Sequence, residues 1–350
     1  MNFIQQQAAA AHRHFPLHHF YHALGYLLLA VTTLLLFSHP AQAAEFRQVS
    51  QQSRFQLSGE VHDIALLPGR RAALAAYGSG VVLADFSQPH QPQVLHTATF
   101  SKQAEAIAVA AGGQRLYVAN GSAGLDILAL APDGSLQLLG RLDTPSYAFD
   151  VALTPNEKIA FVADNTQGVV VVDISRPATP RVITTIPTQA AAAGVTLSRD
   201  GRRLFIADQA NGIAILDVSN PQQPQALARL LTRGHAQAVA LSSDNRRLYS
   251  ANNTGGLQIF ALDNPRQPQL LGSFATLNAF ALSLSPDNRT VFIADLFNGV
   301  QVVDTSRPQQ PQRLSHIRTP GHAQQVTLHP DNRTLLVADG KAGVTIISFR

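Results

Sequence analysis

The sequence predicts an all-β fold, a seven-bladed β-propeller of four-stranded antiparallel blades. Seven glycines recur at intervals of 43 or 44 residues: Gly80, Gly124, Gly168, Gly212, Gly256, Gly299 and Gly343. Around each glycine the chain shows short apolar runs separated by Asp, Asn, Gly and Pro, as in residues 194–232, and no long stretch with helical periodicity. Repeats of this period that are built only from strands are typical of propellers, in which one repeat is one blade.

Residues 1–43 are predicted to be a signal peptide. Residues 24–37 form an uncharged apolar run of 14 residues, which is shorter than the roughly 20 residues that span a membrane. Ala41-Gln42-Ala43 then provides a small-residue cleavage site before Ala44. We therefore expect export to the periplasm, the cell surface or the medium, with an uncleaved N-terminal anchor as the alternative. No transmembrane segment is expected after cleavage.

Composition narrows the partners that the propeller, residues 44–350, can have. The chain has no cysteine, so disulfides and lipid attachment at a cysteine are excluded. Of its 26 basic residues only Arg13 precedes residue 44, and all 22 acidic residues follow it, so the exported part has a net charge of 25 − 22 = +3. Such a weakly basic, exported chain is not expected to bind nucleic acid.

The two ends of the propeller complement each other. Residues of about 46–59 form a strand that has no repeat of its own, and the last repeat ends after three strands. We expect the N-terminal strand to complete the last blade and close the ring, because closure removes exposed strand edges. The predicted repeats span about 60–103, 104–146, 147–190, 191–234, 235–277, 278–321 and 322–350.

Each repeat has four strands, a to d, in the same order. Strand a begins with a large apolar residue flanked by a small one, and a turn of Asp, Asn or Gly leads into strand b. Strand c follows the marker glycine, and in most repeats strand d follows Pro-x-x-Pro. Strand b ends in an acid or amide at Asn120, Asp164, Asp208, Asn252, Asp295 and Asp339. These six residues are expected to cap turns, with a hard-cation site as the alternative.

The strand c sequence followed by Pro-x-x-Pro, as in VVVVDISRPATP and IAILDVSNPQQP, resembles the LVIVD repeat of bacterial and archaeal surface proteins. The strand b text (LFIAD, VFIAD, LYVAN) is similar to that of YVTN-type propellers. The resemblance covers residues 46–350 and implies a scaffold or binding module without a shared catalytic motif. The outline also resembles a seven-bladed lactonase family, but we match no catalytic set from it.

The predicted site lies on the face that we name the top, which bears the loops from strand d to strand a and the b–c turns. Residues at the start of strand a differ between blades where the rest of the repeat is uniform, and such variation is how a repeat fold builds a site. The candidate binding residues are Glu60, His62, Glu105, Tyr147, Phe149, Asp150, His235, Gln237, Asn278, Phe280, His322 and Gln324. The alternative is that they are ordinary solvated loop residues.

The sequence favours a non-enzymatic module that binds a protein or a cell-envelope polymer through the top face. No catalytic residue, metal site or cofactor is predicted, and the oligomeric state stays open. The main alternative is a lactonase-like hydrolase that uses the rim carboxylates and histidines, and His62, His235 and His322 leave open a transition-metal site. Acidic residues concentrate at the top and arginines in the a–b turns at the bottom, so a bottom face that engages an anionic surface is a further alternative.

Overall fold

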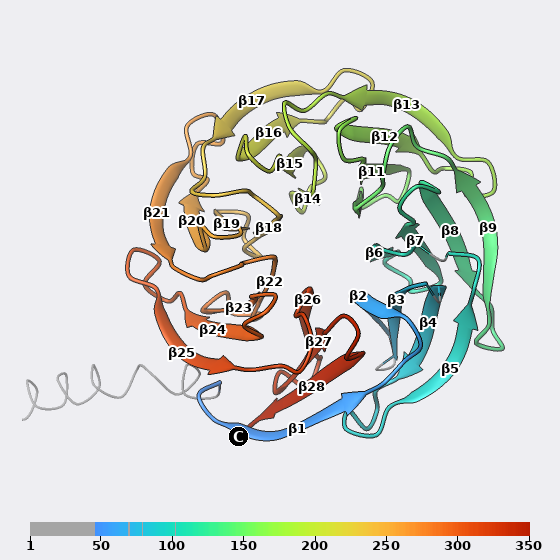
Figure 1. The fold of residues 1–350 in the computed structure, drawn as a ribbon. Helices are drawn as coiled ribbons and strands as arrows, with labels where there is room; N and C mark the ends of the chain where they lie inside the picture. Colours follow the sequence, from blue (N-terminus) through green and yellow to red (C-terminus); the bar gives the residue numbers. More distant parts are fainter. Residues whose placement is uncertain (1–45, 69–70, 79, 102) are drawn as a thin grey trace, which may run out of the picture. The chain divides into compact units, whose positions relative to one another are not determined.

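The computed structural model describes residues 46–68, 71–78, 80–101 and 103–350, and the predicted signal peptide lies outside these residues. Glu45–Arg350 form one compact unit. Every regular element in the described part is a strand, and the strands form seven four-stranded antiparallel sheets. Figure 1 shows these sheets arranged as blades around a common centre. The predicted seven-bladed β-propeller is therefore confirmed.

The strands are short and repeat in the same order. The inner strands a are β2 (Glu60–Leu67), β6 (Ala106–Val109), β10 (Asp150–Leu153), β14 (Gly194–Leu197), β18 (Ala238–Leu241), β22 (Ala281–Leu284) and β26 (Gln325–Leu328). The strands b are β3 (Arg71–Tyr77), β7 (Arg115–Ala119), β11 (Ile159–Ala163), β15 (Arg203–Ala207), β19 (Arg247–Ala251), β23 (Thr290–Ala294) and β27 (Thr334–Ala338).

The strands c are β4 (Gly80–Asp85), β8 (Leu125–Leu130), β12 (Val169–Asp173), β16 (Ile213–Asp217), β20 (Leu257–Ala261), β24 (Val300–Asp304) and β28 (Val344–Phe349). The outer strands d are β5 (Gln93–Ala98), β9 (Leu136–Leu142), β13 (Arg181–Ile186), β17 (Gln225–Leu230), β21 (Gln269–Phe274) and β25 (Gln312–Ile317). In the seventh sheet the outer position belongs to β1 (Val49–Phe55), which pairs antiparallel with β28. The two ends of the described chain thus lie in one blade (Figure 1).

The marker glycines recur because strand d passes close to them. Gly212 has a φ of +74°, and a Cβ on it would lie 2.0 Å from the carbonyl oxygen of Leu230 at the end of β17. Such a contact excludes every side chain. At Gly343 the same close approach comes from the carbonyl oxygen of Phe55, 2.3 Å from the ideal Cβ position. Phe55 of β1 therefore occupies, in the seventh blade, the place that strand d residues occupy in the others.

The hydrophobic core lies between neighbouring blades. A representative cluster joins Phe161 and Val171 of the third blade to Val195 and Ile206 of the fourth, all buried. Strand a contributes its large residue to such a cluster, as the alternation of large and small residues predicts. Apolar residues that recur from blade to blade fill the interface between each pair of neighbouring blades. The positions at which the blades differ in sequence therefore lie at the two faces of the ring.

Candidate binding site

Eleven of the twelve predicted site residues occupy two equivalent positions, two and four residues before the first large residue of a strand a, and Asp150 lies one residue before that residue. The first blade departs from the others there. Its β2 and β3 extend further, so that Glu60 pairs with Tyr77, and the register shifts between Val61 and Asp63. This shift is a β-bulge at His62, and bulges characteristically redirect a side chain.

His62 belongs to a hydrogen-bonded network that joins three blades. Its Nδ1 lies 2.6 Å from Oε2 of Glu105 in the second blade. Oη of Tyr147, in the third blade, donates to Oε1 of the same carboxylate at 2.5 Å. The imidazole also stacks on the ring of Tyr77, with centroids 5.2 Å apart and planes inclined by 15°. Both Glu105 oxygens are thus held by neighbours, which fixes the orientation of the imidazole.

The protonation of this network follows from its surroundings. Partial burial raises the pKa of Tyr147, and the Glu105 carboxylate raises that pKa further because it accepts a hydrogen bond from the neutral phenol and repels a phenolate. Tyr147 therefore remains a hydrogen-bond donor at physiological pH. Its ring also packs against Phe149, with centroids 4.9 Å apart, which extends the network with an aromatic surface.

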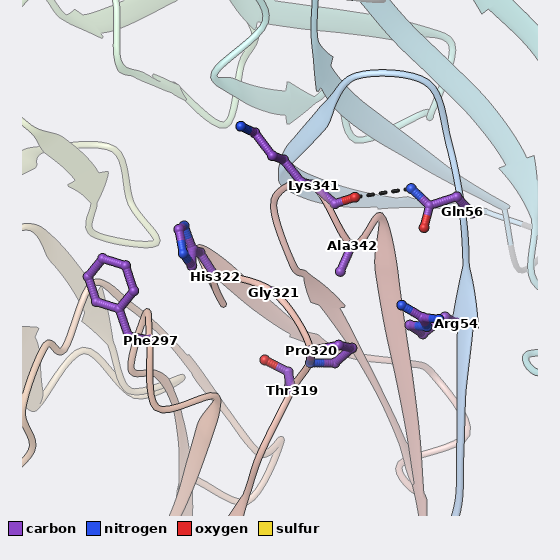
Figure 2. Close-up of a pocket in the computed structure, with 9 residues that line it drawn as sticks. All are labelled: Arg54, Gln56, Phe297, Thr319, Pro320, Gly321, His322, Lys341 and Ala342. Atoms are coloured by element: carbon purple, nitrogen blue, oxygen red, sulfur yellow. Dashed lines mark hydrogen bonds between the residues drawn. The ribbon is translucent and has the colours of Figure 1, made fainter.

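A second feature of the top face is a pocket of about 540 Å³ beside the seam between β1 and β28. We call it the seam pocket. Figure 2 shows its nine lining residues: Arg54, Gln56, Phe297, Thr319, Pro320, Gly321, His322, Lys341 and Ala342. They come from β1 and the residues after it, the β23–β24 turn, the β25–β26 loop and the β27–β28 turn. Its volume is that of a small-ligand site.

Local contacts hold the walls of the seam pocket. Gln56 Nε2 donates to the carbonyl oxygen of Lys341 at 3.0 Å, which ties the segment after β1 to the seventh blade. The rings of Phe297 and His322 meet edge to face, with centroids 4.5 Å apart. Beneath them, Asp339 accepts hydrogen bonds from Thr319 Oγ1 and the Gly321 amide. The loop that forms the floor is therefore fixed from below.

The seam pocket and the three-blade network are continuous. Lys341 Nζ lies 3.5 Å from Oε1 of Glu60, and Oε2 of Glu60 lies 3.9 Å from Nε2 of His62. These contacts complete a series that runs through the sixth, seventh, first, second and third blades. We call the series the top arc; it comprises Phe297, His322, Lys341, Glu60, His62, Glu105, Tyr147 and Phe149.

The structure thus brings six of the twelve predicted residues into one arc. His235 is exposed, and Gln237, Asn278, Phe280 and Gln324 are partly buried; they occupy equivalent positions of the fifth, sixth and seventh blades. Among the described contacts, none of these five joins the arc through a hydrogen bond, ion pair or ring contact.

Asp150, the twelfth predicted residue, has a different environment. Its Oδ1 accepts from the amide of Val151 and its Oδ2 from the amide of Val195, each at 2.8 Å, so it joins the third blade to the fourth. Asp63 makes the same pair of bonds between the first and second blades, to Ile64 and Ile107. Desolvation, and to a lesser extent the charge of Asp63, raise the pKa of Asp150 to about 7.

The predicted acidic top face requires correction. Asp164, Asp208, Asp295 and Asp339 are completely buried. Each accepts hydrogen bonds from the loop that enters strand a of its own blade; Asp164, for example, accepts from Thr144 Oγ1 at 2.6 Å and the Ser146 amide at 2.9 Å. These carboxylates serve as internal acceptors and contribute no acidic solvent-exposed surface. In the described part of the chain, no group of three His, Cys, Asp or Glu residues is arranged to hold a metal ion.

Sequence reasoning missed Tyr77, Arg54, Gln56, Phe297 and Lys341. For Phe297 and Lys341 a signal was present. The second residue after the strand b acid or amide is small in four repeats, at Ser122, Thr166, Ala210 and Thr254, but is Phe297 and Lys341 in the sixth and seventh. For Arg54 and Gln56 the signal lay in the closing strand, whose neighbours are known only once the ring is built.

Comparison with known families matches the LVIVD repeat to residues 146–188 and 197–232. These two stretches, which lie in the third and fourth blades, match the LVIVD repeat. The matched residues include β11 to β13 of the third blade and β15 to β17 of the fourth. The strand c signature noted in the sequence therefore corresponds to β12 and β16, which each lie between two other strands of their blade. Comparison with curated proteins gave no match.

Solved propellers from several different proteins resemble this propeller. The periplasmic gluconolactonase PpgL of Pseudomonas aeruginosa is 19% identical with a TM-score of 0.70, over 77% of this chain and 88% of that one. Hydrazine synthase of Kuenenia stuttgartiensis is 16% identical with a TM-score of 0.69, over 85% and 98%. The propeller domain of Cps50 (Swd1) from Myceliophteria thermophila is 14% identical with a TM-score of 0.70, over 86% and 99%. Likeness at this identity shows the fold alone.

Proposed function

We propose that this LVIVD-repeat propeller is an exported, non-enzymatic module that binds a protein or a cell-envelope polymer through its top face. The top arc is the observation that supports the proposal. It is the place where polar, charged and aromatic residues that differ between blades are connected into one surface. The scaffold beneath it is nearly uniform, and repeat proteins place their binding surfaces on such variable positions.

Exposed apolar side chains at the top support binding over catalysis. Phe297 is 67% exposed and Leu277, in the β21–β22 loop, is 65% exposed. Single exposed apolar residues are common on folded domains, so Phe297 supports binding chiefly because it lines the seam pocket together with cationic side chains. Aromatic residues are also enriched among those that contribute most to binding energy.

Export is supported by the predicted signal peptide and is compatible with the periplasmic location stated for the gluconolactonase neighbour. No helix among the described residues is long and apolar enough to span a membrane. Cell fractionation of the full chain tests this part of the proposal. Recovery of the protein in the cytoplasm, with residues 1–43 intact, would refute export.

A test of top-face binding uses substitutions that copy the repeat itself. Phe297→Ser and Lys341→Thr introduce the residue types found at Ser122 and Thr254, so the turn is expected to keep its geometry. Immobilised protein is exposed to envelope extract, and we expect both variants to retain less of the captured partner than the wild type. Arg246→Gln, in a bottom a–b turn, removes one positive charge far from the arc and serves as the control. Capture that is lost only with the bottom variant would contradict the proposal and favour a bottom-face scaffold.

The hydrolase alternative has one supporting observation, the Glu105 carboxylate that orients the His62 imidazole at 2.6 Å. A carboxylate in this position can hold an imidazole for acid–base chemistry. The adjoining seam pocket weakens the alternative, because none of its nine described lining residues is acidic. Assay of lactone hydrolysis separates the two functions: turnover by the wild type that His62→Ala abolishes would replace the binding proposal.

A further inference from the structure

Two b–c turns that border the seam pocket carry residue types that the corresponding turns of the second to fifth blades lack. Where four repeats place Ser, Thr or Ala, the sixth and seventh blades place Phe297 and Lys341, and both side chains line the pocket. Neither is needed by the turn, because the second to fifth blades form the same turn with a small residue. The two substitutions in neighbouring blades therefore indicate a requirement of the pocket and not of the fold.

The lining has one sign of charge. Arg54 and Lys341 are exposed cations and His322 is an exposed imidazole, while none of the nine described lining residues is acidic. The nearest paired carboxylate, Glu60, holds Lys341 at 3.5 Å but does not line the pocket. An anionic ligand would therefore meet two cations, each of which can donate charge-assisted hydrogen bonds to it.

The buried carboxylate nearest to the pocket does not line it. Asp339 accepts from Thr319 Oγ1 at 2.7 Å, the Gly321 amide at 3.0 Å and Thr345 Oγ1 at 2.7 Å. These three donors occupy its oxygens, and the residue has no exposed surface, so a ligand in the pocket would not contact it. The charged side chains that a ligand would contact are those of Arg54 and Lys341.

Phe297 supplies a flat apolar surface. The residue is 67% exposed, and its ring packs edge to face against His322, with 4.5 Å between centroids. Aromatic rings at binding sites provide stacking area at little entropic cost. Figure 2 shows Phe297 next to His322 at one side of the pocket, Arg54 at the opposite side, and Lys341 toward the top of the view. A ligand that fills this space needs a ring at one side and a negative group toward the other.

We propose that the seam pocket binds an acidic sugar unit, a saccharide ring with a carboxylate or phosphate group, as part of a cell-envelope polymer. The ring would lie on Phe297, and Lys341 with Arg54 would bind the anionic group. A volume of about 540 Å³ accommodates one or two such units. This inference rests on the proposed top-face binding function and names its ligand. An acidic peptide would satisfy the charges but would leave the aromatic surface without a ring to stack on.

The test is calorimetric titration of the purified protein with defined probes. Digalacturonic acid supplies the carboxylate, glucose 6-phosphate the phosphate, and maltose is the neutral ring control. We expect at least one acidic sugar to bind at least tenfold more tightly than maltose, and the better of the two identifies the anionic group. Binding should weaken as salt increases, because exposed charges are screened.

The same titrations are repeated with the variants. Lys341→Thr and Phe297→Ser should each weaken binding of the acidic sugar about tenfold, whereas Arg246→Gln should leave it unchanged. Arg54→Gln provides a third variant, and thermal unfolding verifies that each protein is folded. Equal binding of maltose and the acidic sugars, unchanged affinity in the Lys341 and Phe297 variants, or tighter binding of a Glu hexapeptide than of any sugar would overturn the inference.

The outcomes separate this inference from the function on which it rests. If no acidic sugar binds but the top-face variants still lose the partner captured from envelope extract, the ligand assignment fails and top-face binding stands. If capture is insensitive to the top-face variants, the proposed function fails first.

Discussion

Replacing Asp150 with Asn should remove a pH-dependent part of the stability of the ring. Both carboxylate oxygens accept backbone amides, one in its own blade and one in the next. Desolvation raises the pKa of Asp150 from an ordinary 3.8 to about 7. Between these two pKa values the folded state holds a proton on Asp150 that the unfolded state has released. The stabilisation that this proton provides is therefore fully present below about pH 3.8 and is lost as pH rises through about 7.

The magnitude follows from the shift. The difference is 7 − 3.8 = 3.2 units, and at about 1.36 kcal/mol per unit it corresponds to at most about 4 kcal/mol. The side chain is only half-buried, so solvent screening makes this an upper limit. The asparagine side chain of the variant Asp150→Asn would be uncharged at every pH and would keep one acceptor oxygen. The substitution should therefore also lower the free energy of unfolding by about 1 kcal/mol at every pH, because one backbone amide loses its hydrogen bond.

The assay is urea unfolding of both proteins at several pH values between 4.5 and 7.5. The free energy of unfolding of the wild type, relative to the variant, should fall steadily across this range. Asp173→Asn is the matched control: hydrogen bonds from Ser175 lower the pKa of Asp173, so its contribution is constant above about pH 4. A wild-type-minus-Asn difference that does not change between pH 4.5 and 7.5, or that rises with pH, would refute the reasoning.

Three further predictions concern the fold and its processing. Gly212→Ala should lose about 2 kcal/mol or more, because φ is +74° and the new Cβ would lie 2.0 Å from a carbonyl oxygen, whereas Gly112→Ala, with no atom within 4 Å, should change urea unfolding little. Arg141→Met should lower the free energy of unfolding by about 1–3 kcal/mol, because the completely buried Asp126 would lose its cationic partner, whereas Arg141 itself is partly solvated. A decrease no larger than that caused by Arg181→Met, at an exposed arginine, would contradict this prediction. N-terminal sequencing of the exported protein should begin at Ala44, and a chain that begins at Met1 would show a retained anchor.

The fold could be predicted because its constraints are local and repeat. Gly212 and its six counterparts must be glycine wherever strand d crosses them, so the period of the propeller is visible in the sequence. The buried acids at the ends of strand b also repeat, because each blade must hold the loop into strand a. Their number at the top suggested an acidic face, and only burial shows that they point into the blades.

The site was predictable only in part, because it depends on contacts between blades. Variation at the start of strand a identified His62, Glu105 and Tyr147, but not that one carboxylate would join the other two side chains. Asp150 belongs to the same variable set, and its role depends on the amide of Val195, 45 positions later. The bulge at His62 likewise has no signature in the residues themselves.

The position of the seam pocket has a consequence for stability. Arg54 and Gln56 belong to β1 and the segment after it, while Lys341 and His322 belong to the seventh blade, so the pocket exists only when β1 is paired with β28. A ligand that contacts both sides would bind the closed ring and not a ring from which β1 has detached. At a ligand concentration of about 100 times Kd, this difference stabilises the folded state by about 2.7 kcal/mol. A propeller whose terminal strands meet beside the proposed ligand site would thus be most resistant to opening where the ligand is abundant.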